Sequence, residues 1–232
     1  MKYKRILLKL SGEVLAGEKT TGIDFDRTIE IAREIKECVN LGYEIGIVVG
    51  GGNFWRGKSN EYMDRATSDY IGMMGTVMNA LALGDAFKQI GTPVRVQTGV
   101  EMRQIAEFYI KDRATRHLEK GRVVIFGCGT GSPFFSTDTA SSLRAAEIKA
   151  DILVKATKVD GVYDKDPKKF DDAKRFEDIT YIDVLNKKLH VMDSTAISLC
   201  MEEEIPILAF DILQKGNLKK AILDMGVGTI VK

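Results

Sequence analysis

Short and almost uninterrupted apolar runs alternate along the chain with segments whose apolar residues recur every three or four positions. The runs ILLKL, IGIVV, VVIF and ILV have the composition of parallel strands that are buried on both faces. The periodic segments between them predict amphipathic helices. This alternation indicates an α/β fold, in which helices cover both faces of a mainly parallel, twisted sheet.

The bounds of the apolar runs and the residues that interrupt them predict where each element begins and ends. Strands are expected at 5–10, 43–49, 94–97, 122–126, 152–156 and 206–210, with an edge strand at 229–231. Helices are expected at 26–41, 68–90, 113–120, 138–150, 193–204 and 218–223. Glycines end the first three helices, at Gly42, Gly91 and Gly121. The longest helix is expected to bury a stripe formed by Ile71, Met74, Met78 and Leu81. The charged stretch 160–178 is expected to be irregular.

The composition narrows the class of protein. The 232 residues are 44% hydrophobic and 29% charged, as in a soluble globular protein, and no linker divides the expected single domain 1–232. A net charge of +1 does not indicate a nucleic-acid or membrane partner. The three cysteines are widely spaced, so no disulfide is expected and a reducing cytoplasm fits. Lys9 interrupts the first apolar run, which argues against a signal peptide, and no run is long enough to span a membrane.

Candidate chemistry follows the first two strands, since ligands of such sheets bind beyond the carboxyl ends of strands. Lys9 lies near the end of a buried strand, where a lysine either reaches solvent or meets an anion such as a phosphoryl group. The second strand ends in three glycines, Gly50 to Gly52, and Arg56 follows at a distance suited to a phosphate contact. These glycines form either a plain turn or a turn that a ligand approaches closely. Neither GxGxxG after a strand nor a Walker A sequence occurs.

Two later loops carry further polar and aromatic residues. The segment GCGTGSPFFSTD, residues 127–138, brings glycines, hydroxyls and two aromatics to the start of a helix, where an anion or a sugar can bind. Asp138 in this segment either caps its helix or orients Lys9 or a Mg²⁺ ion. The segment from Thr157 to Pro167 is either a polar loop or a nucleotide site that involves Tyr163 and Asp166.

Six segments of the chain together resemble the bacterial uridylate (UMP) kinases of the amino acid kinase superfamily. They are KRILLKLSGE, VVGGGNFWRG, SDYIGMMGTVMNALAL, GTGSPFFSTDTAS, LVKATKVDGVYDKDPKK and LHVMDSTA. The resemblance extends from Tyr3 to Val231. It implies a three-layer αβα sandwich and transfer of a phosphoryl group from Mg·ATP to UMP in pyrimidine synthesis. It also implies a homohexamer that GTP activates and UTP inhibits.

The resemblance further implies roles for individual residues, with the N-terminal part mainly binding UMP and the C-terminal part mainly binding ATP. The ATP site would comprise Lys9, Leu10, Ser11, Gly12, Gly52, Arg56, Thr157, Tyr163 and Asp166. The UMP site would comprise Gly51, Asp69, Thr130, Gly131, Ser132, Pro133, Phe134, Phe135, Ser136 and Thr137. The catalytic residues would be Lys9, Arg56 and Asp138. Magnesium would arrive on the ATP phosphates without a directly ligating side chain. The region of GTP activation would comprise Gly17, Glu18, Lys19, Thr20, Thr21 and Gly22.

Two other functions are compatible with the same fold. Kinases of the superfamily that phosphorylate carboxyl or carbamate groups would need an amino acid pocket instead of the aromatic wall around PFF. A protein that senses an anion or nucleotide without turnover would be expected to lack Lys9 or Asp138, and both residues are present.

Overall fold

A computed structural model describes residues 2–56, 62–167, 169–224 and 226–232. Within these residues, nine strands form one sheet with the order β4-β3-β5-β2-β1-β6-β8-β9-β7. The strands are β1 (Arg5–Leu10), β2 (Glu44–Val49), β3 (Val94–Thr98), β4 (Glu107–Phe108), β5 (Val123–Gly127), β6 (Ile152–Thr157), β7 (Asp178–Ile179), β8 (Ile207–Asp211) and β9 (Thr229–Val231). In this described sheet β8 and β9 are antiparallel, and the other neighbours are parallel.

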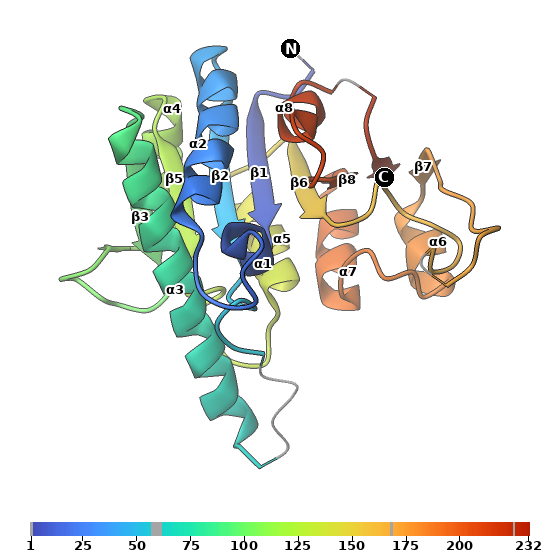
Figure 1. Cartoon of the computed structure of the whole chain (residues 1–232), viewed down its shortest axis with the longest axis horizontal. Helices are drawn as coiled ribbons and strands as arrows, with labels where there is room; N and C mark the ends of the chain where they lie inside the picture. The colour runs from blue at the N-terminus through green and yellow to red at the C-terminus, as the bar shows by residue number, and fades with distance from the viewer. Residues whose placement is uncertain (1, 57–61, 168, 225) are drawn as a thin grey trace.

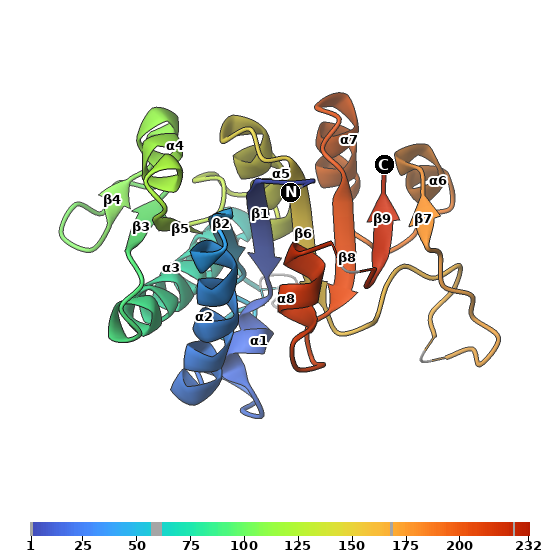
Figure 2. The same ribbon diagram turned by 90° about the horizontal axis from the view of Figure 1, so that it is seen from above.

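Helices cover both faces of the sheet and complete a three-layer αβα sandwich (Figure 1, Figure 2). One layer contains α1 (Gly12–Ala16), α2 (Phe25–Asn40), α3 (Arg65–Gln89) and α8 (Asn217–Ile222). The other contains α4 (Lys111–Glu119), α5 (Thr137–Glu147), α6 (Tyr181–Asn186) and α7 (Ser194–Glu202). The fold class and the mainly parallel sheet are therefore confirmed.

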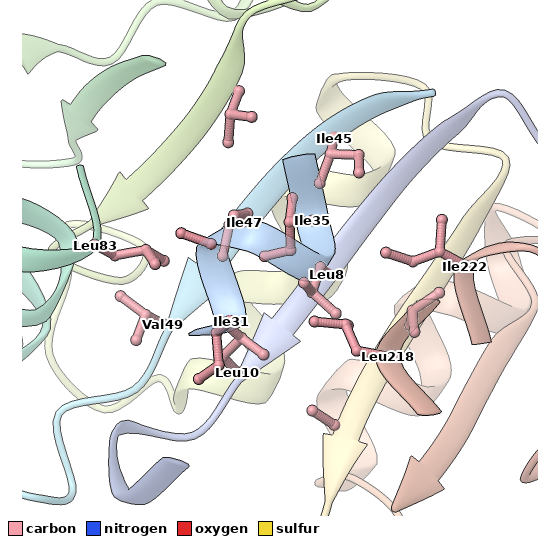
Figure 3. Close-up of a cluster of buried hydrophobic side chains, with 14 of the residues drawn as sticks. Leu8, Leu10, Ile31, Ile35, Ile45, Ile47, Val49, Leu83, Leu218 and Ile222 are labelled. Atoms are coloured by element: carbon pink, nitrogen blue, oxygen red, sulfur yellow. The ribbon is translucent and has the colours of Figure 1, made fainter. Parts of the chain in front are cut away.

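The hydrophobic core lies on both faces of the sheet because successive strand residues point to opposite sides. Leu8 and Leu10 of β1 pack with Ile31 and Ile35 of α2 and with Leu218 of α8 (Figure 3). The intervening β1 residue Leu7 belongs to the second cluster, which includes residues of α5 and α7. All residues of β2 and β5 are buried, as predicted for strands covered on both faces.

The predicted buried stripe of α3 is wrong, because its four members are 37–44% exposed. The face that packs on the sheet is lined largely by small or polar residues, including Gly75, Thr76, Asn79, Ala80 and Gly84, with Leu83 and Phe87 near the end. A Cβ atom at Gly84 would lie 2.8 Å from Val96 Cγ2, so the helix and the sheet approach each other closely. The large apolar side chains remain on the outer face of the helix.

Most predicted elements are confirmed to within three residues of their expected ends, and Gly42, Gly91 and Gly121 all have positive φ. The strand at 229–231 exists, but it pairs with β7 as well as β8, so β7 is the edge strand. The short elements α1, α6, β4 and β7 were not predicted, because they are too short to show a periodic pattern. Among the described helices, none is both long and apolar enough to cross a membrane.

Candidate active site

The strand order reverses at the border between β1 and β6. On one side of β1 the sheet continues through β2, β5, β3 and β4. On the other side it continues through β6, β8, β9 and β7. The carboxyl ends of β1, β2, β5 and β6 meet at the same edge of the sheet, since these neighbours are parallel. Crevices at such reversals are the usual ligand sites of open parallel sheets.

Two cavities open at this edge, and each is large enough for a nucleotide-sized ligand. The first has a volume of about 550 Å³, and its walls include Lys155, Thr157, Tyr163 and Asp166. The second has a volume of about 490 Å³ and lies between α3, the loop after β5 and the start of α7. Its walls include Gly51, Gly52, Asp69, Thr130, Ser132, Phe134, Phe135, Ser136 and Thr137. Gly131 and Pro133 belong to the same loop but do not line this cavity.

The three glycines after β2 meet different surroundings. A Cβ atom on Gly51 would lie 2.5 Å from the Gly72 carbonyl oxygen, so this glycine permits close packing on α3. A Cβ atom on Gly50 would lie 3.3 Å from the backbone nitrogen of Gly12. At Gly52 the same atom would meet open space, and Gly52 lines the second cavity. Two of the glycines are therefore explained by the protein itself, and Gly52 is the one that leaves room for a ligand.

A buried pair of asparagines holds this turn in place. Asn79 of α3 donates a hydrogen bond to the Gly50 carbonyl oxygen at 2.6 Å and another to Asn53 Oδ1 at 2.7 Å. Asn53 in turn donates through Nδ2 to the Gly22 carbonyl oxygen at 2.7 Å, and Gly22 N donates to the Asn53 carbonyl oxygen. The pair connects the glycine turn to α3 and to the segment 17–22.

Lys9 meets a carboxylate, as one reading of its position predicted. Its Nζ atom lies 2.9 Å from Asp138 Oδ1, and both side chains are largely buried. Lys155 donates to the other oxygen, Asp138 Oδ2, also at 2.9 Å. Burial alone would raise the pKa of Asp138, but the two ammonium groups outweigh burial and hold that pKa below its usual value. Ser136, and not Asp138, caps α5, since its hydroxyl accepts from Thr139 N.

Arg56 and the residues that follow β1 have different surroundings. The Arg56 guanidinium, two-thirds exposed, forms an ion pair with Glu13, and Glu13 also pairs with Lys158 from the loop after β6. Ser11 precedes α1 and Gly12 begins it. Leu10 is fully buried in the core, so its side chain is not available to a ligand.

The second cavity is organised by two carboxylates. Asp69 Oδ2 accepts from Phe134 N at 2.8 Å and from Arg65 Nε at 2.9 Å, which ties α3 to the loop after β5. Asp193 caps α7 and also accepts hydrogen bonds from Ser136 and Thr139 at the start of α5. Phe134 and Phe135 are more than half exposed and form part of the wall.

Sequence reasoning did not identify five residues that organise the site: Glu13, Asn53, Asn79, Lys155 and Asp193. A signal for Lys155 was present, because ILVKA in β6 repeats the pattern of ILLKL in β1, with a lysine at the same place. The asparagine pair and Glu13 act through contacts between distant segments, which no local pattern reveals. None of these five residues was included in the ATP site or the UMP site predicted from the sequence.

Comparisons with known proteins agree with this arrangement. The model of the amino acid kinase family matches residues 4–211. The chain is similar to the crystal structure of a UMP kinase from Bacillus anthracis, at 39% sequence identity and a TM-score of 0.95, over 99% of this chain and 96% of that one. It is similar to a UMP kinase from Ureaplasma parvum at 35% identity and a TM-score of 0.94, over 100% of both chains. A uridylate kinase from Archaeoglobus fulgidus is 27% identical with a TM-score of 0.73, over 98% of this chain and 99% of that one.

Proposed function

The chain belongs to the amino acid kinase family, and we propose that it is a UMP kinase, which transfers a phosphoryl group from Mg·ATP to UMP in pyrimidine nucleotide synthesis. One observation carries the proposal: two nucleotide-sized cavities flank the Lys9–Asp138–Lys155 group. The similarity in sequence and structure to two UMP kinases over nearly the full chain supports UMP as the acceptor.

The two cavities divide between the two nucleotides. The first cavity is built from residues 155–209 and would take the ATP nucleoside against Thr157, Tyr163 and Asp166. The second is built mostly from residues 51–139 and would take UMP against Asp69 and the loop after β5. The phosphates would meet over Gly52, where a side chain is missing and space is open. This division supports the assignment of UMP mainly to the N-terminal part and ATP mainly to the C-terminal part.

Phosphoryl transfer requires alignment of the two oxygens and neutralisation of charge on the transferred group. Lys9 is the buried cation that would neutralise this charge, and Asp138 would orient its ammonium group. Arg56 would assist by exchanging its contact with Glu13 for a contact with phosphate oxygens, which its exposed position permits. No general base is required, because the acceptor oxygen of UMP is already ionised at neutral pH.

Magnesium would be bound mainly by the phosphates. Among the described residues, no group of three His, Cys, Asp or Glu side chains could hold a metal ion. Both oxygens of Asp138 already face lysine ammonium groups, which leaves this carboxylate suited to an outer, water-mediated contact. These residues fit a metal that arrives with ATP and neutralises phosphate charge there.

The regulatory part of the proposal is a homohexamer that GTP activates and UTP inhibits; one feature supports self-association, and another supports an effect of the segment 17–22 on the site. The exposed apolar stripe of α3, formed by Ile71, Met74, Met78 and Leu81, offers an interface to a second copy of the chain. The segment 17–22, proposed as the region of GTP activation, is bonded through Gly22 to Asn53 in the glycine turn. A change in that segment would therefore reach the phosphate-binding turn through this contact.

The direct test is release of ADP from Mg·ATP with UMP, CMP, dUMP, AMP, glutamate, aspartate or carbamate as acceptor, with and without GTP or UTP. We expect turnover with UMP, and a loss of roughly 10²–10³-fold in kcat in Lys9→Met, as found when one preorganised charge contact is removed. Turnover with an amino acid or carbamate instead would refute UMP as acceptor. Binding of UMP without turnover would favour a sensor.

A further inference from the structure

The Lys9–Asp138–Lys155 group contains one more cation than its carboxylate can neutralise. In the parallel pairing of β1 with β6, Lys9 lies directly beside Lys155. Residues paired in this way point to the same face of a sheet, here the face covered by α5 and α7. Asp138, in the first turn of α5, is placed between the two ammonium groups and gives one oxygen to each.

The ammonium group of Lys155 is held by two acceptors. Its ammonium group donates to Asp138 Oδ2 and to the Val191 carbonyl oxygen, and the side chain is largely buried. The charged groups that act on it are Asp138 from α5, Lys9 from β1 and Asp193 at the start of α7. Burial lowers the pKa of Lys155, Asp138 opposes this effect, and Lys9 adds to it. Burial of a second ammonium group beside the first therefore carries a cost in desolvation and repulsion, which Asp138 offsets in part.

The sharing of Asp138 has a consequence for Lys9. With Lys155 present, Lys9 meets a carboxylate that is already bound through its second oxygen, and the three groups together carry one positive charge. Without Lys155, both oxygens of Asp138 would be free to pair with Lys9, and the charge of the group would fall to zero. Less positive charge would then remain for the anionic transferred group.

We propose that Lys155 is a positioning residue of the transfer reaction, which holds Asp138 through one oxygen so that Lys9 keeps its charge directed at the phosphates. The proposal rests on the kinase function proposed above. It assigns to Lys155 a role beyond lining the first cavity, and it makes Lys155 and Asp138 a coupled pair.

A double-mutant cycle in the full-length protein tests this coupling with Lys155→Met, Asp138→Asn and the double variant. We expect Lys155→Met to lower kcat by roughly 10–100-fold with the KM for UMP changed by less than about threefold, as for loss of a charge effect in the transition state. In the Asp138→Asn background, the same change should alter kcat by less than about threefold. Lys155→Arg, which keeps the charge, should recover part of the loss, and Lys88→Met at the exposed end of α3 serves as the matched control.

Two kinetic outcomes would overturn the proposal. Equal losses from Lys155→Met in both backgrounds would mean that Lys155 does not act through Asp138. An unchanged kcat together with a lower Tm would mean that Lys155 only stabilises the fold.

A measurement without substrate separates this proposal from the function itself. Titration of the Asp138 carboxyl carbon by NMR in the ligand-free protein should give a higher pKa in Lys155→Met than in the wild type, because one of two stabilising ammonium groups is gone. An unchanged pKa would refute the link between the two residues. Failure of the wild-type protein to phosphorylate UMP would instead refute the proposed function and leave this titration interpretable.

Discussion

Gly51 and Gly52 are adjacent in the chain, yet a side chain at each would have a different effect. At Gly51 a Cβ atom would approach the backbone of α3, at 2.5 Å from Gly72 O and 3.0 Å from Thr76 N. At Gly52 it would enter open space in the second cavity. One glycine is therefore required for packing, and the other leaves space open in the cavity.

Alanine at these two positions should separate stability from activity. Gly51→Ala should destabilise the fold by about 1–3 kcal/mol, as overpacking does, and lower the Tm by roughly 2–4 °C per kcal/mol. Gly52→Ala should leave the Tm nearly unchanged and lower kcat/KM for UMP by roughly tenfold, because a methyl group would occupy the space where the phosphates meet. Thermal unfolding and steady-state kinetics on both variants provide the comparison. Similar Tm losses in both would contradict the assignment of Gly52 to the ligand.

At the residue scale, sequence reasoning succeeded where a single residue type limits the options. A lysine at the end of a buried strand needs an anion, and Lys9 indeed meets Asp138. Lys155 was missed, since its importance follows from the register of β6 on β1, and that pairing joins residues far apart in the chain. The packing of Gly51 on α3 was missed for a similar reason, although Gly51 also lines the second cavity.

The helix α3 is the element in which sequence and structure differ most. It extends past the edge of the sheet (Figure 1) and presents Ile71, Met74, Met78 and Leu81 outward. The spacing of these residues, three and four positions apart, forms a continuous apolar seam along one side of the helix. Periodicity located this stripe correctly but could not tell whether it faces the sheet or another chain, because both partners are apolar.

A charge in the stripe should weaken self-association. We expect Met78→Glu to shift the protein toward smaller assemblies in sedimentation velocity at micromolar concentration, because an unpaired carboxylate would be buried in the interface. Leu41→Glu makes the same kind of change at an exposed apolar residue after α2 and should leave the assembly intact. Identical assembly states for both variants would show that copies of the chain do not associate through α3.

At the scale of the whole molecule, the buried thiols predict how stability depends on pH. Burial raises the pKa of Cys38 to about 12 and that of Cys200 to about 11, from an ordinary value near 9. Above pH 9 the unfolded chain therefore releases protons that the folded chain keeps. Because the folded state then binds more protons than the unfolded state, its stability decreases as pH rises.

The expected loss can be measured by thermal unfolding between pH 9 and 10.5. Two such thiols should together cost about 3 kcal/mol over this interval, which corresponds to roughly 6–12 °C in Tm for a chain of this size. The variant Cys38→Ala removes one titrating group and should flatten the curve by about half of that amount. A curve that is equally steep in the variant would exclude the Cys38 thiol as a cause.

The layered architecture was predictable from sequence because alternating strands and helices allow few other arrangements. The order of the strands was not, since the local pattern does not specify that β6 returns to the far side of β1 or that β9 pairs between β8 and β7. The site depends on that order. Its acidic and basic residues come from β1, α5 and β6, and they meet only in the completed sheet.

The central place of β1 has a consequence for synthesis on the ribosome. Among the described strands β1 is made first, but its second neighbour, β6, ends only at Thr157. At translation rates of roughly 5–20 residues per second, an apolar strand edge stays unpaired for roughly ten to thirty seconds. Nascent chains stalled before β6 emerges should be cleaved within residues 5–10 by protease, and chains stalled after β6 has emerged should resist cleavage there. The strand that carries Lys9 is thus also a segment of the newborn chain with one edge unpaired until β6 is made.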